Sequence, residues 1–360
     1  MPRDCAPSGR IEENLTFAQK FISNVETGLS EEESQIYIVG RSPAGLSLTM
    51  VDSTDLSTAK QSTISLFNTT TSSVMKQITS FYLATAADAN LVLVAMNEIT
   101  FPAGGGKGTS DMRVLNCSAF GSAVSCDPLF FEANVVPMAV ATSKDGSISI
   151  IVSSSKLTVW DTFSLYTEKL PGFPYTAALS PSGRVLAIPF SNGLVSVYTR
   201  LANSGTLSRM DIPIPYLTGP NQIVCSDRWI AFLNVEQPAA VWNLFIGQFD
   251  AEFKILRNLT LAYSPSDSNR ASDFSMPKNV NLQSDRYLIV GFSANTAPYN
   301  VWVFDLELLE TDSLQSPQFF FAVPGGVNQV ATSLSLHQSP FIAITSSTGA
   351  VWTTGWSFPV

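Results

Sequence analysis

Short apolar runs alternate with polar turns along most of the chain, and the clearest repetition spans residues 143–199. In this stretch a four-residue turn (143–146 and again 180–183) precedes a run rich in β-branched residues (147–152 and 184–188). Each turn ends in glycine, which tolerates the positive φ of tight hairpin turns. β-Branched residues favour strands. The pattern therefore predicts hairpins of short strands, and helical periodicity is hard to find anywhere.

Seven of these strands end alike, with an aromatic or aliphatic residue followed by a small or acidic polar one. The seven endings are Val51-Asp52, Leu115-Asn116, Trp160-Asp161, Tyr198-Thr199, Trp242-Asn243, Phe304-Asp305 and Trp352-Thr353. They recur at intervals of roughly 40 to 60 residues, which is typical of a β-propeller with one four-stranded blade per repeat. The sequence predicts an all-β fold, a seven-bladed β-propeller.

The endings Val159-Trp160-Asp161 and Val303-Phe304-Asp305, with the turns at 143–146 and 180–183, resemble the WD-repeat-like propeller superfamily. The resemblance is best over residues 135–200, and the Gly-His pair typical of WD repeats is missing throughout, as in a divergent member. It implies a propeller ring. It implies no particular activity, because many functions share this fold.

We expect one domain, residues 1–360, and a ring closed by the N-terminus. The expected blades are residues 34–78, 79–133, 134–172, 173–216, 217–262, 271–324 and 325–360. The last blade runs out of chain after its third strand, which leaves an exposed edge. Residues 13–22 alternate roughly between polar and apolar positions, and we predict that they supply the missing strand.

The amino-acid composition argues against several classes of binding partner. The net charge is −9, and the 20 basic residues form no run. Nucleic acids and anionic membrane surfaces require clustered Lys and Arg, so neither is expected as a partner. No apolar stretch approaches the roughly 20 residues of a membrane helix. If Met1 is the native start, no signal peptide is present and a cytoplasmic protein is expected; if a leader was removed, an extracellular one.

Histidines, glycine-rich loops and carboxylates are the candidate sources of catalytic chemistry in this sequence. The single histidine, His337, cannot form a metal site of two or three histidines. The loop at 103–109 lacks the Gly-Lys-Ser/Thr order of a phosphate-binding loop. Asp52, Asp161 and Asp305 occupy equivalent strand ends, where a side-chain hydrogen bond to a turn is the expected role. We expect no catalytic, cofactor or metal site.

The cysteines leave an alternative open. Cys117 and Cys126 flank a turn-rich stretch and either form a disulfide across a hairpin or remain two reduced thiols.

Four Asn-x-Ser/Thr sequons begin at Asn14, Asn68, Asn116 and Asn258. Their number is roughly what chance produces in a chain of this composition, so it does not indicate glycosylation by itself.

The tryptophans do not form a repeated sugar-binding motif. Trp160, Trp242, Trp302 and Trp352 share one strand position and are expected to pack between blades, whereas Trp356 is the best candidate for exposure. Residues 62–73 and 264–270 lengthen two of the repeats, and such insertions often bind partners.

We therefore predict a non-enzymatic protein-interaction or structural scaffold module, a subunit of a larger assembly with other protein subunits as partners. One alternative is a secreted glycoprotein or lectin-like binder. The other is a propeller hydrolase or lactonase whose carboxylates, Asp52, Asp161 or Asp305, gather at one channel mouth.

Overall fold

The computed structural model describes residues 12–16, 23–29, 35–42, 45–52, 61–68, 75–86, 89, 91–102, 107–120, 123–161, 164–200, 207–214, 222–236, 241–263, 277–283, 285–292, 301–311, 314, 317–321, 327–332, 341–346 and 350–355. These residues form four-stranded antiparallel sheets and one short helix, α1 (Glu307–Glu310). The chain is divided into two compact units, Phe17–Pro174 (unit 2) and Met1–Thr16 with Tyr175–Val360 (unit 1). The predicted all-β fold is confirmed.

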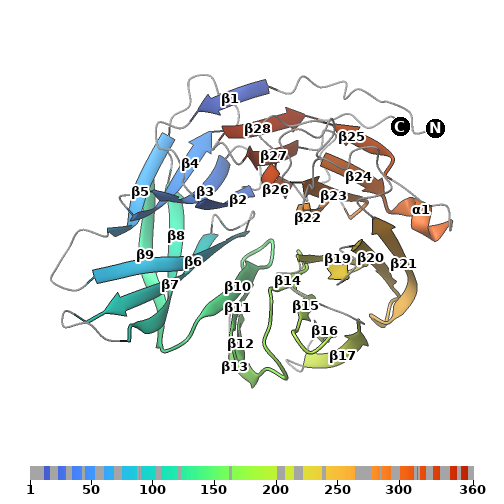
Figure 1. The fold of residues 1–360 in the computed structure, drawn as a ribbon, viewed down its shortest axis with the longest axis horizontal. Coiled ribbons are helices and arrows are strands. Elements are labelled where there is room, and N and C mark those ends of the chain that lie inside the picture. Colours follow the sequence, from blue (N-terminus) through green and yellow to red (C-terminus); the bar gives the residue numbers. More distant parts are fainter. Residues whose placement is uncertain are drawn as a thin grey trace. The chain divides into compact units, whose positions relative to one another are not determined.

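Unit 2 contains three sheets, each built from consecutive strands (Figure 1). The first is β2 (Ser23–Leu29), β3 (Gln35–Ser42), β4 (Gly45–Asp52) and β5 (Gln61–Asn68). The second is β6 (Met75–Ala86), β7 (Leu91–Phe101), β8 (Thr109–Phe120) and β9 (Ala123–Ala133). The third is β10 (Pro137–Thr142), β11 (Ile148–Ser153), β12 (Lys156–Asp161) and β13 (Ser164–Lys169).

The apolar faces of neighbouring sheets in unit 2 form its core. Buried residues of the first two sheets, such as Leu48 and Val94, share one cluster. The second and third sheets share another, which includes Val114 and Ile151. Side chains on both faces of the middle sheet are buried, and β7 accordingly has seven consecutive buried residues, at 92–98. Such a run is what a strand covered on both faces requires.

Unit 1 contains the remaining sheets of the described chain. The first is β14 (Ala178–Leu179), β15 (Val185–Pro189), β16 (Leu194–Arg200) and β17 (Leu207–Pro213). The second is β18 (Ile223–Cys225), β19 (Trp229–Glu236), β20 (Val241–Phe249) and β21 (Ile255–Tyr263). The third is β22 (Pro277–Gln283), β23 (Tyr287–Phe292), β24 (Val301–Asp305) and β25 (Phe319–Phe321). The last sheet consists of β26 (Val327–Thr332), β27 (Phe341–Ser346), β28 (Ala350–Gly355) and β1 (Glu12–Thr16).

The fourth strand of the last sheet comes from the opposite end of the chain. β1, drawn in blue, lies along β28, drawn in red (Figure 1), and the two pair antiparallel from Glu12 opposite Thr353 to Thr16 opposite Ala350. This is the pairing that the predicted closing strand requires. The paired residues are 12–16, and residues 17–22 of the predicted strand lie outside the described part of the chain.

The two predicted turns are confirmed, and their geometry explains their sequence. Gly146 and Gly183 have φ of 71° and 72°, a region that disfavours residues with a Cβ. The hydroxyl of Ser143 accepts a hydrogen bond from the amide of Ile148 at 3.0 Å, and Ser180 does the same for Val185. The turns are therefore fixed locally, which is why they could be recognised in the sequence.

The sheet limits differ from the expected blade limits at the N-terminal end. The first sheet begins at Ser23, before the expected start at residue 34, and β6 begins at Met75, before the expected limit at 78. The Ser/Thr-rich stretch expected as an insertion is mostly strand β5; its residues 69–73, and the second insertion at 264–270, lie outside the described residues.

Candidate functional site

The strand-end carboxylates are distributed between the units. Asp305, at the end of β24 in unit 1, accepts two hydrogen bonds from the guanidinium of Arg286, at 3.1 Å from Nε and 2.8 Å from Nη2. It also accepts the backbone N–H of Glu307 at 3.2 Å. Asp161 ends β12 in unit 2 and is half-buried, and Asp52 ends β4, with its side chain outside the described part. Asp305 thus occupies a bidentate ion pair, a geometry that orders both partners.

Other expected candidates add no chemistry to the described residues. His337 and residues 103–106 lie outside them, whereas residues 109–120, after the loop, form strand β8. Within the described chain, no three His, Cys, Asp or Glu side chains come together as metal ligands. Burial raises the pKa of the Cys225 thiol, which keeps it protonated and unsuited to nucleophilic attack.

A hydrogen-bond network joins the turns that precede the second strands of the unit 1 sheets. The hydroxyl of Ser182 donates to Asp227 at 2.5 Å, and that of Ser226 donates to the carboxylate of Asp285 in the next sheet. Trp229 Nε1 donates to the backbone oxygen of Asp285 at 2.8 Å. Burial raises the pKa of Asp285, and the Ser226 hydrogen bond opposes that rise. The network links each of these turns to the turn of the next sheet, so its role is structural.

Beside these turns, charged side chains surround helix α1. Glu310 accepts hydrogen bonds from Arg228 and, at 2.8 Å, from Gln248 Nε2. Arg257 donates to the Glu310 backbone oxygen. Arg286 lies over the ring of Tyr287, 4.9 Å from its centroid. Each of these cations has a partner within unit 1, so the surface around α1 is occupied by internal pairing.

A second polar cluster lies in the long-stranded β6–β9 sheet of unit 2. The side chain of Glu98 is only 3% exposed and pairs with Lys76 Nζ at 2.6 Å and Arg113 Nε at 2.7 Å. Beside it, Asn97 donates to Thr79 at 2.6 Å and accepts from Ser110 at 2.7 Å. A buried carboxylate with two cations is electrically compensated, so this cluster holds three strands together.

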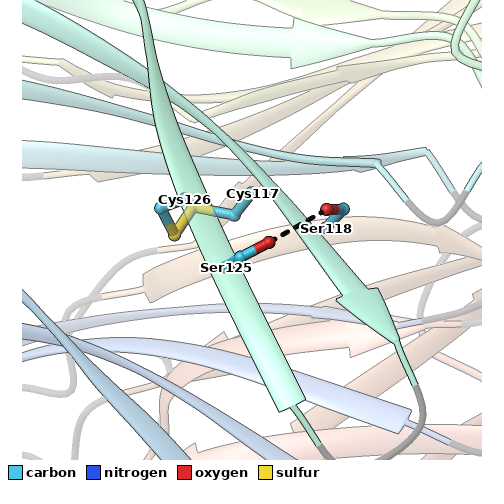
Figure 2. Close-up of a disulfide and its surroundings, with 4 residues drawn as sticks. All are labelled: Cys117, Ser118, Ser125 and Cys126. Atoms are coloured by element: carbon cyan, nitrogen blue, oxygen red, sulfur yellow. Dashed lines mark hydrogen bonds between the residues drawn. A yellow bond between two sulfur atoms is a disulfide. The ribbon is translucent and has the colours of Figure 1, made fainter.

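The same sheet carries the disulfide. Cys117 on β8 and Cys126 on β9 are directly opposite each other, with Cα atoms 4.0 Å apart, and their sulfurs are bonded (Figure 2). Next to it the hydroxyls of Ser118 and Ser125 lie 3.4 Å apart, also across the strand pair (Figure 2). Of the two possibilities that the sequence left open, the structure has the disulfide.

Large apolar side chains are exposed mainly on outermost strands. Leu129 (47%) and Phe131 (55%) lie on β9, and Leu165 (62%) and Tyr166 (38%) on β13, both in unit 2. The other two such residues among the described side chains are Phe173, shortly after β13, and Leu256 on β21 in unit 1. Clustered exposed apolar residues indicate contact with another molecule more than scattered ones do.

Two tryptophans on inner strands, Trp160 of β12 and Trp302 of β24, pack between sheets as expected. Trp160 of β12 meets Phe130 of β9 edge to face, with ring centroids 5.4 Å apart, which confirms that it packs between sheets. Lys156, on the same strand, pairs with Glu132 at 2.7 Å. Trp302 packs against the core between β18–β21 and β22–β25. The side chains of Trp242, Trp352 and Trp356 lie outside the described part.

Sequence reasoning missed the Glu98 cluster and the exposed strand edges. One signal was present for Glu98, since Asn97 and Glu98 interrupt an otherwise apolar strand, and a charge in a buried strand requires a partner. The exposed residues carried no such signal, because a leucine or phenylalanine in a strand looks the same whether it faces a core or solvent.

Comparison with known proteins supports the fold and leaves the activity open. No protein-family model and no curated protein sequence matches the chain. Among solved structures 868 chains match, including Raptor from Chaetomium thermophilum, at a TM-score of 0.59 and 10% sequence identity. The match covers 98% of this chain and 30% of the Raptor chain. No described helix is long and apolar enough to cross a lipid bilayer. At this identity the likeness concerns the fold alone: four-stranded antiparallel sheets, consistent with a β-propeller.

Proposed function

We propose that the chain is a seven-bladed, WD-repeat-like propeller that acts as a non-enzymatic protein-interaction module, with other protein subunits as its partners. The pairing of β1 with β28 supports a closed ring, because it completes the last four-stranded sheet with the first strand of the chain. A closed ring has no unpaired terminal sheet and forms a rigid support for a binding surface.

The observation that carries the proposal is the exposure of apolar side chains on β9 and β13. Leu129, Phe131, Leu165 and Tyr166 keep between about a third and two thirds of their surface in water, although the chain has ample polar residues for surface positions. Each strand also has one backbone edge that pairs with no other strand of its sheet. Such an edge can accept a strand from a partner, while neighbouring apolar side chains supply contact area.

The chemistry of the described residues is consistent with binding. Two of the carboxylates have internal partners: Asp305 pairs with Arg286, and Glu98 pairs with Lys76 and Arg113. A general acid or base would have to come from outside these pairs. The proposed role is therefore display of the exposed side chains of β9 and β13 to a partner.

The test is partner retention by matched surface variants. The full chain, tagged and expressed in its own source, is purified under non-denaturing conditions, and its assembly mass is compared with that of the variant Phe131→Ser/Leu165→Ser. Leu256→Ser is the control, since Leu256 is equally exposed but lies on β21. We expect a wild-type assembly heavier than one chain, lost in the double variant and kept in the control. A wild type that migrates as a single bare chain would refute the proposal.

A secreted binder is the second candidate function, and the Cys117–Cys126 disulfide favours it. Disulfides form and persist in oxidising compartments and are rare in the cytosol. This candidate concerns where the interaction module works, and it is compatible with the surface on β9 and β13.

A further inference from the structure

The sequons differ sharply in where the fold places them. Asn14 lies on β1, Asn68 ends β5 and Asn258 lies on β21, and each of these strands is the outermost strand of its sheet. Asn116 lies on β8, between β7 and β9. The number of sequons in the sequence does not indicate glycosylation. Their positions in the sheets do bear on it, because a glycan requires open space around the Asn side chain.

Asn258 has that space. Asn258 and Thr260, the two residues that define its sequon, are both exposed on β21. The residue opposite Asn258 on β20 is Gly247, which contributes no side chain beside the amide. Gly247 is itself constrained by packing, because a Cβ there would lie 3.0 Å from Phe245 and 3.1 Å from Ile230.

Asn116 lacks it. Its partner on β7 is Leu93, which is 1% exposed and belongs to the core between the second and third sheets of unit 2. The next residue, Cys117, is fully buried and bonded to Cys126. A glycan on Asn116 would leave the strand on the face that packs against the third sheet of unit 2, and crowding that face would cost free energy as overpacking a core does.

The disulfide supplies an independent indication of the compartment. N-linked glycans are added in the secretory pathway, which is also an oxidising environment where the Cys117–Cys126 bond would form. We propose that Asn258 is an N-glycosylation site and that Asn116 is left unmodified.

The glycan would also protect an edge. β21 has one unpaired backbone edge, and Leu256, two residues before Asn258, is 59% exposed. An exposed edge strand with an apolar side chain is prone to pair with another chain. A bulky, hydrated glycan at Asn258 blocks the approach of a second strand along this edge.

The test is site-by-site mapping on the full protein isolated from its own source. The protein is treated with peptide N-glycosidase in ¹⁸O-labelled water, which converts an occupied Asn into labelled Asp, and its peptides are analysed by mass spectrometry. We expect label at Asn258 and none at Asn116. An unlabelled Asn258 overturns the proposed site, and label at Asn116 overturns the steric argument.

Two variants at one position separate the sequon from general effects on folding. Thr260→Val removes the hydroxyl that the sequon requires and keeps the side-chain shape, whereas Thr260→Ser keeps the hydroxyl. We expect Thr260→Val to lose the mass of one glycan and Thr260→Ser to retain it. Masses of both variants that differ from the wild type only by the substituted side chain would refute occupancy at Asn258. The outcome is separate from the partner test, because a bare Asn258 leaves binding through β9 and β13 untouched.

Discussion

Removing both cations that face Glu98 is expected to destabilise the β6–β9 sheet far more than removing either one. Lys76 and Arg113 approach the Glu98 carboxylate at 2.6 and 2.7 Å, and the carboxylate is 3% exposed. A buried carboxylate left without a partner costs roughly 3 to 5 kcal/mol of unfolding free energy. With one cation kept, the remaining pair still compensates the charge.

The single variants have smaller expected effects because the cations are partly solvated. The side chains of Lys76 and Arg113 are 34% and 45% exposed, so water already screens part of each attraction. We expect Lys76→Met to lower the unfolding free energy by about 1 kcal/mol or less, the range of exposed pairs. Arg113→Met loses somewhat more, because Arg113 also lies over Phe131, 5.5 Å from its centroid.

The assay is urea unfolding of the full chain, together with amide hydrogen exchange of peptides from β7 and β8, which reports local opening of these strands. The double variant Lys76→Met/Arg113→Met should lose roughly 3 to 5 kcal/mol. Adding Glu98→Gln removes the unpaired charge and should restore much of that loss. Additive, small losses in the double variant, with no recovery on adding Glu98→Gln, would refute the argument from an uncompensated buried carboxylate.

Two further predictions concern strand pairing at the outer strands of sheets. Deleting residues 1–16 removes β1 and exposes β28, so the unfolding free energy should fall by roughly 2 to 6 kcal/mol, the contribution of about four ladder hydrogen bonds. Urea unfolding measures this loss, and an unchanged midpoint would show that β1 does not stabilise its sheet. Replacing Cys117 and Cys126 by alanine should lower the unfolding free energy by roughly 2 to 3 kcal/mol for a loop of this length, and a reductant should then destabilise only the wild type. Cys225→Ala is the control, since Cys225 forms no disulfide.

The turns and strand ends could be predicted because their causes are local. The Gly146 and Gly183 turns need only their own residues, and Phe304-Asp305 marks the end of β24 because the polar residue lies where the strand stops. Strand β2 was not anticipated, since its residues Ser23–Leu29 are mostly polar or small and its strand conformation is fixed by pairing with β3. Tertiary context overrides a weak local preference in such a strand.

Pairing across the sheet also explains what was undecided about the candidate sites. The sequence separation of Cys117 and Cys126 allowed a hairpin, but only the register places them directly opposite each other. Glu98 and Lys76 are also brought together by the register of β6 and β7, as a diagonal pair, since Glu98 lies opposite Ile78 and Lys76 opposite Thr100. A shift of one residue would turn each side chain to the other face, so neither contact can be read from composition or spacing.

Among the described residues, the sequons and the pairs of exposed apolar residues lie on different outermost strands, a separation that the sheet fold itself does not require. Sequons occur on β1, β5 and β21, and the paired exposed apolar residues occur on β9 and β13, which contain no sequon. Every outermost strand has the same unpaired edge, and so the same tendency to add a strand from another chain. If glycans block some of these edges, association is confined to the edges without them. The two proposals then concern different strands: in unit 1 a glycan at Asn258 would exclude partners from β21, and in unit 2 the strands that carry Phe131 and Leu165 would remain open to binding.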